Sequence, residues 1–285
     1  MKNTSQKRFN SSYSRILLVA FALMWTTILA TAQGDIYNIK VNVDEGNDSL
    51  IFFADNHEIL PMTLRLKFET EGLTPSEYNQ ELVILKPQSS NNKIAIFKAE
   101  PNKGYGYSYS YQIIKGDINA KHNDDYAYRL PYEKGLRTLL AQGYNGPYSH
   151  QGLKALDFNL PEQTNVLAAR SGLVIETKED SNIGCTNMSC IKLANYVYIL
   201  HDDGTIGQYA HLAFGGVLVG KGDRVERGQL IAKSGKTGFA SGPHLHFQVT
   251  LPSLENGKAI ATKFQISKNE VAFLKEKTYY TSFEN

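Results

Sequence analysis

The chain has 285 residues, of which 42% are hydrophobic and 20% are charged, a composition typical of globular proteins and not of disordered or fibrous ones. Its formal net charge is +2. Four basic residues, Lys2, Lys7, Arg8 and Arg15, lie in the first fifteen positions, so without them the net charge falls from +2 to −2. This balance excludes the basic field that nucleic-acid binding requires, and we expect no nucleic-acid partner.

The first segment has the features of a targeting signal. A basic region ends at Arg15, the apolar run "ILLVAFALMW" follows, and the triplet "ATA" at 30–32 offers a small-x-small cleavage site. We predict a signal peptide over residues 1–32, cleaved before Gln33; an uncleaved anchor is the alternative, although the run is shorter than the ~20 residues of a membrane span. We therefore expect an exported protein of the periplasm, cell envelope or extracellular medium, without stable membrane insertion after cleavage.

Residues 33–130 show an alternation of period two. The runs "IKVNV", "MTLRLKF" and "YGYSYSYQI" alternate apolar or aromatic residues with polar ones, and turn-forming clusters such as "DEGND" and "EPNKG" separate them. Several short strands at this spacing predict a β-sandwich, with an immunoglobulin-like arrangement as a candidate. The row of Tyr105, Tyr107, Tyr109 and Tyr111 has two interpretations. It covers a sheet, which we favour, or it forms a carbohydrate-binding face.

The strand pattern resumes in residues 131–262, after a more polar stretch that begins at 116. Runs such as "GLVIET", "IKLANYVYIL" and "QLIAK" predict a second, mostly β domain, and residues 263–285 are expected to form a C-terminal extension. Helical periodicity is weak, and its best short candidates are "EKGLRTLLAQ" and "KNEVAFLKE". The predicted fold is therefore mostly β, with a β-sandwich followed by an antiparallel β domain.

The two cysteines, Cys185 and Cys190, lie in "CTNMSC". In an exported chain with no other cysteine, the favoured prediction is a disulfide that closes a small loop. A metal pair is the alternative, but the spacing matches no usual zinc knuckle and no second pair exists.

Two histidines stand one residue apart in "SGPHLHFQV", immediately after a Gly-Pro step. If a strand begins there, His244 and His246 share one face while Leu245, Phe247 and Val249 face a core. A surface strand can also carry two histidines without any chemistry. Partners are available, however, because His150, Asp157 and His211 lie in the same half, and a catalytic zinc site holds three nitrogen or oxygen ligands and leaves a fourth position for water.

Three segments of this half, in order, resemble the lysostaphin-like, LytM-type zinc endopeptidases that cut peptidoglycan cross-links. They are His150 and Asp157 in "SHQGLKALDF", His211 in "YAHL", and His244 and His246 in "GPHLHF". The resemblance extends from about residue 140 to 250 and implies a LytM-type antiparallel β peptidase domain. It also implies that His150, Asp157 and His246 bind one Zn²⁺ per chain, and that His211 and His244 carry the acid–base and electrostatic work.

The first motif departs from the family's commonest pattern. That pattern is His-x-Gly-x-Asp, whereas six residues separate His150 from Asp157 here; longer variants ending in "LDF" resemble one branch of the family. Another carboxylate as third ligand is the alternative, although Asp202 and Asp203 lie in a predicted hairpin turn. Tyr144, six residues before His150, stands where some relatives carry a tyrosine that steadies the oxyanion.

These residues predict an exported zinc metalloendopeptidase that hydrolyses peptide bonds in peptidoglycan stem peptides or cross-bridges, with those peptides as its partners. Two alternatives stay open: a non-catalytic cell-wall scaffold that activates another hydrolase, and a metallopeptidase that acts on proteins. Because all five positions of the motifs are filled, catalysis is favoured over the scaffold. No oligomeric state follows from these patterns.

Overall fold

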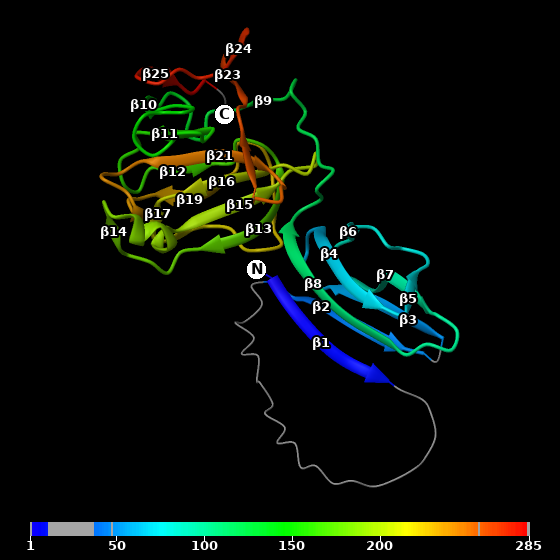
Figure 1. Cartoon of the computed structure of the whole chain (residues 1–285). Helices are drawn as coiled ribbons and strands as arrows, with labels where there is room; N and C mark the ends of the chain where they lie inside the picture. The colour runs from blue at the N-terminus through cyan, green and yellow to red at the C-terminus, as the bar shows by residue number, and fades with distance from the viewer. Residues whose placement is uncertain (1, 11–36, 47, 256, 284–285) are drawn as a thin grey trace. The chain divides into compact units, whose positions relative to one another are not determined.

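The computed structural model describes residues 2–10, 37–46, 48–255 and 257–283, and the chain forms two compact units, Met1–Lys115 and Gly116–Asn285. Both are built almost entirely from β-strands (Figure 1), so the prediction of a mostly β fold is confirmed. The sequence pattern placed the domain boundary after residue 130, within the more polar stretch that begins at 116. In the structure that stretch belongs to the second unit.

The predicted signal peptide lies largely outside the described residues, because its apolar run and its cleavage triplet fall within 11–36. The backbone of β1 (Lys2–Asn10) is described and pairs antiparallel with β8 (Tyr105–Lys115). Among the described residues, no helix combines the length and the apolar character needed to cross a membrane.

The described residues of the first unit form two four-stranded sheets, with strand orders β1-β8-β4-β6 and β2-β3-β7-β5. The remaining strands of the first sheet are β4 (Met62–Glu71) and β6 (Leu82–Leu85). The second sheet consists of β2 (Ile39–Glu45), β3 (Ser49–Asn56), β7 (Ser89–Ala99) and β5 (Leu73–Pro75).

An aromatic cluster joins these two sheets. The ring of Phe52 in β3 lies 4.8 Å from that of Phe68 in β4 and 5.1 Å from that of Tyr109 in β8, measured between centroids. Tyr107 contacts the same phenylalanine at 5.7 Å. The two sheets therefore pack face to face as a sandwich, and these two tyrosines cover the opposing sheet, which is the interpretation we favoured. The immunoglobulin-like arrangement stays a prediction.

The second unit is organised around one antiparallel sheet in the order β18-β13-β15-β16-β21-β11-β10-β25, with β22 also paired to β21. Its strands are β10 (Arg137–Gln142), β11 (Ala155–Phe158), β13 (Gly172–Lys178), β15 (Tyr196–Leu200), β16 (Ile206–Ala210), β18 (Arg224–Val225), β21 (Leu245–Leu251), β22 (Lys258–Ile260) and β25 (Thr278–Thr281).

Three smaller sheets complete the second unit, in the orders β12-β19-β17, β14-β20 and β24-β23-β9. Their strands are β9 (Ala127–Tyr128), β12 (Asn165–Leu167), β14 (Gly184–Cys185), β17 (Leu212–Val217), β19 (Leu230–Ser234), β20 (Gly238–Phe239), β23 (Lys263–Ser267) and β24 (Glu270–Ala272). A 3₁₀-helix, η1 (Met188–Leu193), starts inside the loop that the disulfide between Cys185 and Cys190 closes. The predicted disulfide is thus confirmed.

The large sheet has one core face. In β21, Leu245, Phe247 and Val249 are buried in a continuous hydrophobic cluster that also includes Leu212 and Ile231 from the smaller sheet. The alternate residues of the same strands point to the opposite face. That face carries His246 and its neighbours, so the alternation seen in the sequence separates the core from the site.

Both helix candidates of the second half are strands or turns, so the helical interpretation is wrong for them. In β10, which lies in "EKGLRTLLAQ", Thr138, Leu140 and Gln142 are buried in alternation. Burial in this segment alternates with period two because β10 pairs with β11 on one side and with β25 on the other. This tertiary pairing overrides the helix propensity of the segment.

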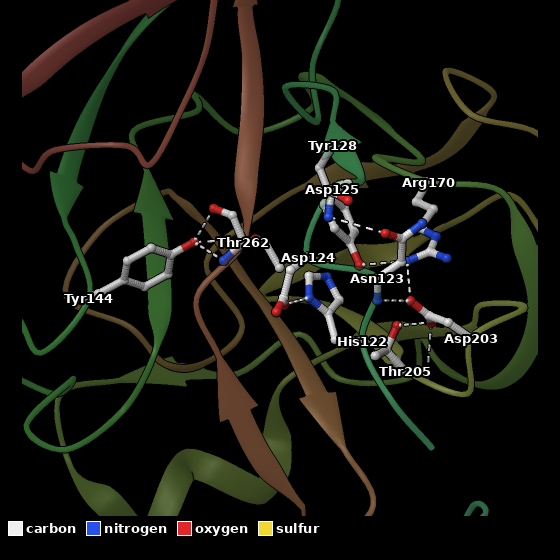
Figure 2. A network of polar contacts seen from close by, with 10 residues as sticks. All are labelled: His122, Asn123, Asp124, Asp125, Tyr128, Tyr144, Arg170, Asp203, Thr205 and Thr262. Atoms are coloured by element: carbon white, nitrogen blue, oxygen red, sulfur yellow. Dashed lines mark hydrogen bonds and ion pairs between the residues drawn. The ribbon is translucent and has the colours of Figure 1, made fainter. Parts of the chain in front are cut away.

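The polar stretch at 116–130 packs against the rest of the second unit, and Figure 2 shows the polar contacts of several of its residues. The carboxylate of Asp203 accepts hydrogen bonds from the backbone N–H of Asn123 (3.0 Å) and from Arg170 Nη1 (2.7 Å). The guanidinium of Arg170 also lies over the Tyr126 ring, 4.2 Å from its centroid, and donates to the Tyr128 hydroxyl. We refer to residues 116–130 as the docked segment.

Candidate metal centre

Two adjacent strands and a loop bring the predicted ligands together. In the β11–β21 pair Asp157 lies directly opposite His246, and in the β10–β11 pair Gln142 lies opposite Asp157. Residues directly opposite one another in an antiparallel pair point to the same face. His150 comes from the loop between β10 and β11. The structure therefore brings together residues that are up to ninety-six positions apart in the chain.

The ligating atoms of His150, Asp157 and His246 all lie within 4.8 Å of one another. His246 Nδ1 is 3.0 Å from Asp157 Oδ1, and His150 Nε2 is 3.3 Å from Asp157 Oδ2. His150 Nε2 is buried and has no hydrogen-bond partner among the described residues. A buried, unpaired imidazole nitrogen beside a carboxylate and a second imidazole is a donor set that suits zinc, so the residues present fit this ion.

Hydrogen bonding sets the tautomer of His150. Its Nδ1 lies 3.1 Å from the backbone carbonyl of Gly143. A carbonyl oxygen only accepts, so Nδ1 carries the proton and Nε2 keeps its lone pair when the ring is neutral. This is the arrangement usually found for metal-ligating histidines.

The electrostatics of the cluster favour an ionised Asp157. Burial alone would raise the pKa of its carboxyl, but the adjacent imidazoles of His150 and His246, with the charge of His244, hold the pKa far below its usual value. For His150, burial acts to lower the pKa, and the adjacent carboxylate of Asp157 outweighs it, so the pKa is raised. The carboxylate is thus available as a charged ligand at neutral pH.

His211 and His244 lie beside this cluster. Their ring centroids are 4.5 Å apart, and His211 lies 5.8 Å from the His246 ring. Nδ1 of His211 is 2.6 Å from the carbonyl oxygen of Thr237, and Nδ1 of His244 is 2.9 Å from that of Gly242. Both neutral rings therefore hold their proton on Nδ1 and a lone pair on Nε2. Burial, reinforced by the charges of His244 and His246, lowers the pKa of His211 to about 3.

The backbone at His211 is unusual, because its φ of +63° lies in the left-handed region that non-glycine residues rarely adopt. Such conformations persist where the surrounding structure holds them, and they cluster at functional sites. Here the chain leaves β16 at Ala210 and enters β17 at Leu212, so this residue makes the turn between two strands.

The disulfide loop braces the segment that holds His211. Gly184 and Cys185 in β14 pair with Gly238 and Phe239 in β20, directly after Thr237. The hydroxyl of Thr237 also accepts a hydrogen bond from the backbone N–H of Asn195 (3.0 Å). The carbonyl that orients His211 is therefore fixed by the residues around the disulfide.

The face that carries the ligands extends across the sheet as a polar surface. Tyr198, Gln208 and Gln248 are aligned across β15, β16 and β21, one row away from His246, and all three are half-buried. The Tyr196 and Tyr198 rings stack at 4.4 Å, and the Gln248 amide donates to Gln208 Oε1 at 2.6 Å. This surface offers amide and aromatic groups beside the metal cluster.

Tyr144 lies in a different environment. Its hydroxyl is 3.0 Å from the carbonyl oxygen of Thr262 and accepts the backbone N–H of the same residue at 3.0 Å (Figure 2). A phenol has a single proton, so donation to this carbonyl leaves none for a substrate. The predicted role of Tyr144 at an oxyanion would require its hydroxyl to leave Thr262.

The remaining candidates lie outside the cluster. Asp203 is engaged by Arg170 and the docked segment, and Asp202 is exposed. His201 is buried, which lowers its pKa to about 4, and its Nδ1 contacts the carbonyl of Ser171. The sequence reasoning missed Gln142, whose side chain donates to Asp157. No sequence signal marks it, because it is a single polar residue at the end of a strand.

Comparisons with known proteins identify this region. Residues 150–262 match Peptidase family M23, so the second unit contains an M23 peptidase domain. Over 93 residues the chain is 38% identical to the peptidoglycan DD-endopeptidase ShyA of Vibrio cholerae, a match that covers 33% of this chain and 19% of that protein. Over 148 residues it is 34% identical to the glycyl-glycine endopeptidase ALE-1 of Staphylococcus capitis, covering 49% of this chain and 35% of that protein.

The chain thus spans about a fifth to a third of the length of these two relatives. Among solved structures, the catalytic domain of lysostaphin from Staphylococcus simulans is similar, with 29% identity, a TM-score of 0.32, and coverage of 45% of this chain and 88% of that one. The recognition of a lysostaphin-like, LytM-type domain from the sequence is confirmed by the family match.

Proposed function

We propose that this chain is an exported zinc metalloendopeptidase that hydrolyses peptide bonds in peptidoglycan stem peptides or cross-bridges, with one Zn²⁺ per chain. The observation that carries the proposal is the convergence of His150, Asp157 and His246 within 4.8 Å on one face of the sheet. The similar protein ShyA is named as a peptidoglycan DD-endopeptidase and ALE-1 as a glycyl-glycine endopeptidase, which supports the substrate class.

The chemistry follows from the donor set. When bound, zinc supplies a Lewis acid that brings the pKa of a coordinated water toward about 7 and polarises a peptide carbonyl. Three protein ligands leave a further position for water and substrate. Because Asp157 is ionised and a neutral imidazole always keeps a lone pair on one ring nitrogen, each of the three side chains can offer a donor atom to the ion.

His211 and His244 are assigned the proton transfers. Each holds its Nδ1 proton against a backbone carbonyl, so its Nε2 can accept a proton from the attacking water and return it to the leaving amine. Burial keeps His211 neutral at physiological pH, so its Nε2 carries a lone pair. His244 Nε2 lies 3.8 Å from Asp157 Oδ1, so this ring stands at the edge of the ligand cluster.

The test uses purified full-length protein and three single variants. His246→Ala is expected to lose both zinc and activity, and His211→Ala to keep zinc and lose activity by at least about 100-fold, the usual contribution of a general base. His57→Ala, an exposed residue of the first unit, is the matched control. Zinc is measured by atomic absorption, and new amino termini are measured on isolated peptidoglycan.

Three outcomes would contradict the proposal or redirect it. Full wall-cleaving activity in both histidine variants would refute it. Zinc binding without any hydrolysis of peptidoglycan would favour the scaffold alternative if proteins are not cut either. Cleavage of unfolded proteins but not of peptidoglycan would identify a metallopeptidase that acts on proteins. Mass spectrometry of the released muropeptides identifies the bond that is cut.

A further inference from the structure

Gln142 is the last residue of β10, and its side chain is 6% exposed. Its Nε2 donates to Asp157 Oδ2 and to Ser149 Oγ, both at 2.9 Å. Its Oε1 accepts from the backbone N–H groups of Tyr148 (2.9 Å) and Ser149 (3.1 Å). A primary amide has two N–H groups and two acceptor lone pairs, so all four hydrogen-bonding positions of this side chain are in use.

We propose that Gln142 is a positioning residue that holds the carboxylate of Asp157 and the loop carrying His150 in the arrangement that binds a divalent ion. The inference rests on the proposed function, because it concerns the same site. Gln142 contacts two of the elements that supply ligands and is not itself a ligand. A ligating carboxylate usually needs such an outer partner to fix its orientation.

On the carboxylate side, the two oxygens of Asp157 have different partners. Oδ1 faces His246 Nδ1 at 3.0 Å, and Oδ2 accepts from Gln142 at 2.9 Å and lies 3.3 Å from His150 Nε2. The amide of Gln142 therefore determines the rotation of the carboxylate about its last bond. Because this donor is neutral, it orients the carboxylate without an opposing charge that would weaken metal binding.

On the loop side, the acceptor of Gln142 binds the two backbone N–H groups that directly precede His150. The loop closes tightly around the amide, because a Cβ on Gly146 would lie 2.3 Å from Gln142 Cγ. The histidine is then oriented by its own bond from Nδ1 to the carbonyl of Gly143. The side chain of Gln142 thus holds the backbone that precedes His150 and also orients the carboxylate of Asp157.

The geometry accounts for the residue type. Asparagine is one methylene shorter and cannot reach both Asp157 and the loop. Methionine has a similar length but provides no donor for the carboxylate and no acceptor for the two N–H groups. Glutamate would place a second negative charge against Asp157. Only glutamine combines this reach with both a donor and an acceptor in neutral form.

The experiment measures zinc affinity of the folded protein by competition with a chromogenic chelator, together with the visible spectrum of the Co²⁺ form. Gln142→Met and the milder Gln142→Asn are each expected to weaken zinc binding by about 10- to 100-fold and to change the Co²⁺ bands. Gln265→Met, a half-buried glutamine of β23, is the control and should stay within twofold of the wild type. Circular dichroism of the metal-free proteins verifies folding.

The outcomes separate the two proposals. Wild-type protein that binds no zinc would overturn the proposed function itself. Wild-type protein that binds zinc, with both folded Gln142 variants binding within threefold and giving unchanged Co²⁺ bands, would overturn the positioning role alone. Should both variants fail to fold, NMR of the wild type decides. The side-chain amide protons of Gln142 are expected to exchange slowly and to shift on zinc addition, and rapid exchange without a shift contradicts the role.

Discussion

Replacing Asp203 by alanine tests how strongly the docked segment stabilises the second unit. The two carboxylate oxygens of Asp203 receive four hydrogen bonds. Oδ2 accepts from Arg170 Nη1 (2.7 Å) and the Asn123 N–H (3.0 Å), and Oδ1 accepts from the Thr205 N–H (3.1 Å) and hydroxyl (2.6 Å). The side chains of Arg170 and Asp203 are only 9% and 12% exposed. Asp203→Ala therefore leaves a nearly buried guanidinium without its carboxylate.

Two estimates bound the cost of this substitution. Removing one partner of a buried ion pair typically costs about 3–5 kcal/mol. Burial alone would raise the pKa of Asp203, but hydrogen bonds from Thr205, Asn123 and Arg170 lower it from 3.8 to about 2, which corresponds to roughly 2 kcal/mol. Since Arg170 keeps the Tyr128 hydroxyl and the Tyr126 ring, we expect about 2–3 kcal/mol, or a melting temperature lower by about 5–10 °C.

Scanning calorimetry of the full chain measures this loss of stability. The transition that shifts when zinc is added is the one to follow, because the proposed metal site lies in the second unit. Asp202→Ala is the matched control, because Asp202 is the exposed neighbour in the same turn. A loss below about 1 kcal/mol, or an equal loss in both variants, would refute the reasoning. The pH dependence gives a second check. The pKa of Asp203 is depressed in the folded state, so its contribution is complete above pH ~4 and disappears as the pH falls toward about 2.

Three further predictions concern the disulfide, a glycine and the metal. Replacing Cys185 and Cys190 together by serine should lower the free energy of unfolding in urea by at most about 2 kcal/mol, because the closed loop is short, with a sequence separation of 5. A loss above about 4 kcal/mol would contradict the argument from loop length. Gly184→Ala should lower both the activity and the melting temperature of the second unit, because the new Cβ would lie 2.0 Å from the Lys236 carbonyl oxygen beside β20. Unchanged activity and melting temperature would mean that β14 does not brace His211. Zinc at 100 times its dissociation constant should stabilise the second unit by about 2.7 kcal/mol, and a chelator should reverse this in calorimetry; equal shifts in His246→Ala would place the ion elsewhere.

The shared face of His244 and His246 could be predicted from the sequence because its signal is local, whereas the roles of His150 and His211 rest on the resemblance. In "PHLHF" the alternation with Leu245 and Phe247 places His244 and His246 on one face whatever strand lies beside them. Asp157 needed the resemblance to a known family, because nothing local distinguishes it from Asp202 or Asp203. The structure makes the distinction through pairing, since Asp157 lies opposite His246, whereas Asp203 is bound to Arg170.

The docked segment and β10 show where sequence patterns fail. Residues 116–130 are polar, and within them Asn123 and Tyr128 are bound by Asp203 and Arg170, far along the chain. The run that contains β10 has apolar residues at spacings that also suit a helix, and its partners β11 and β25 decide the outcome. In both cases the deciding contacts are remote in sequence.

The same reason explains why Gln142 had to come from the structure. The family match begins at His150, whereas Gln142 lies eight residues earlier, in a strand whose register with β11 shifts between Leu140 and Gln142. That irregularity brings the glutamine opposite Asp157, because a regular antiparallel register would pair position 142 with position 156, whose side chain points to the other face. A motif identifies the atoms that bind a metal, but the atoms that orient them depend on strand register.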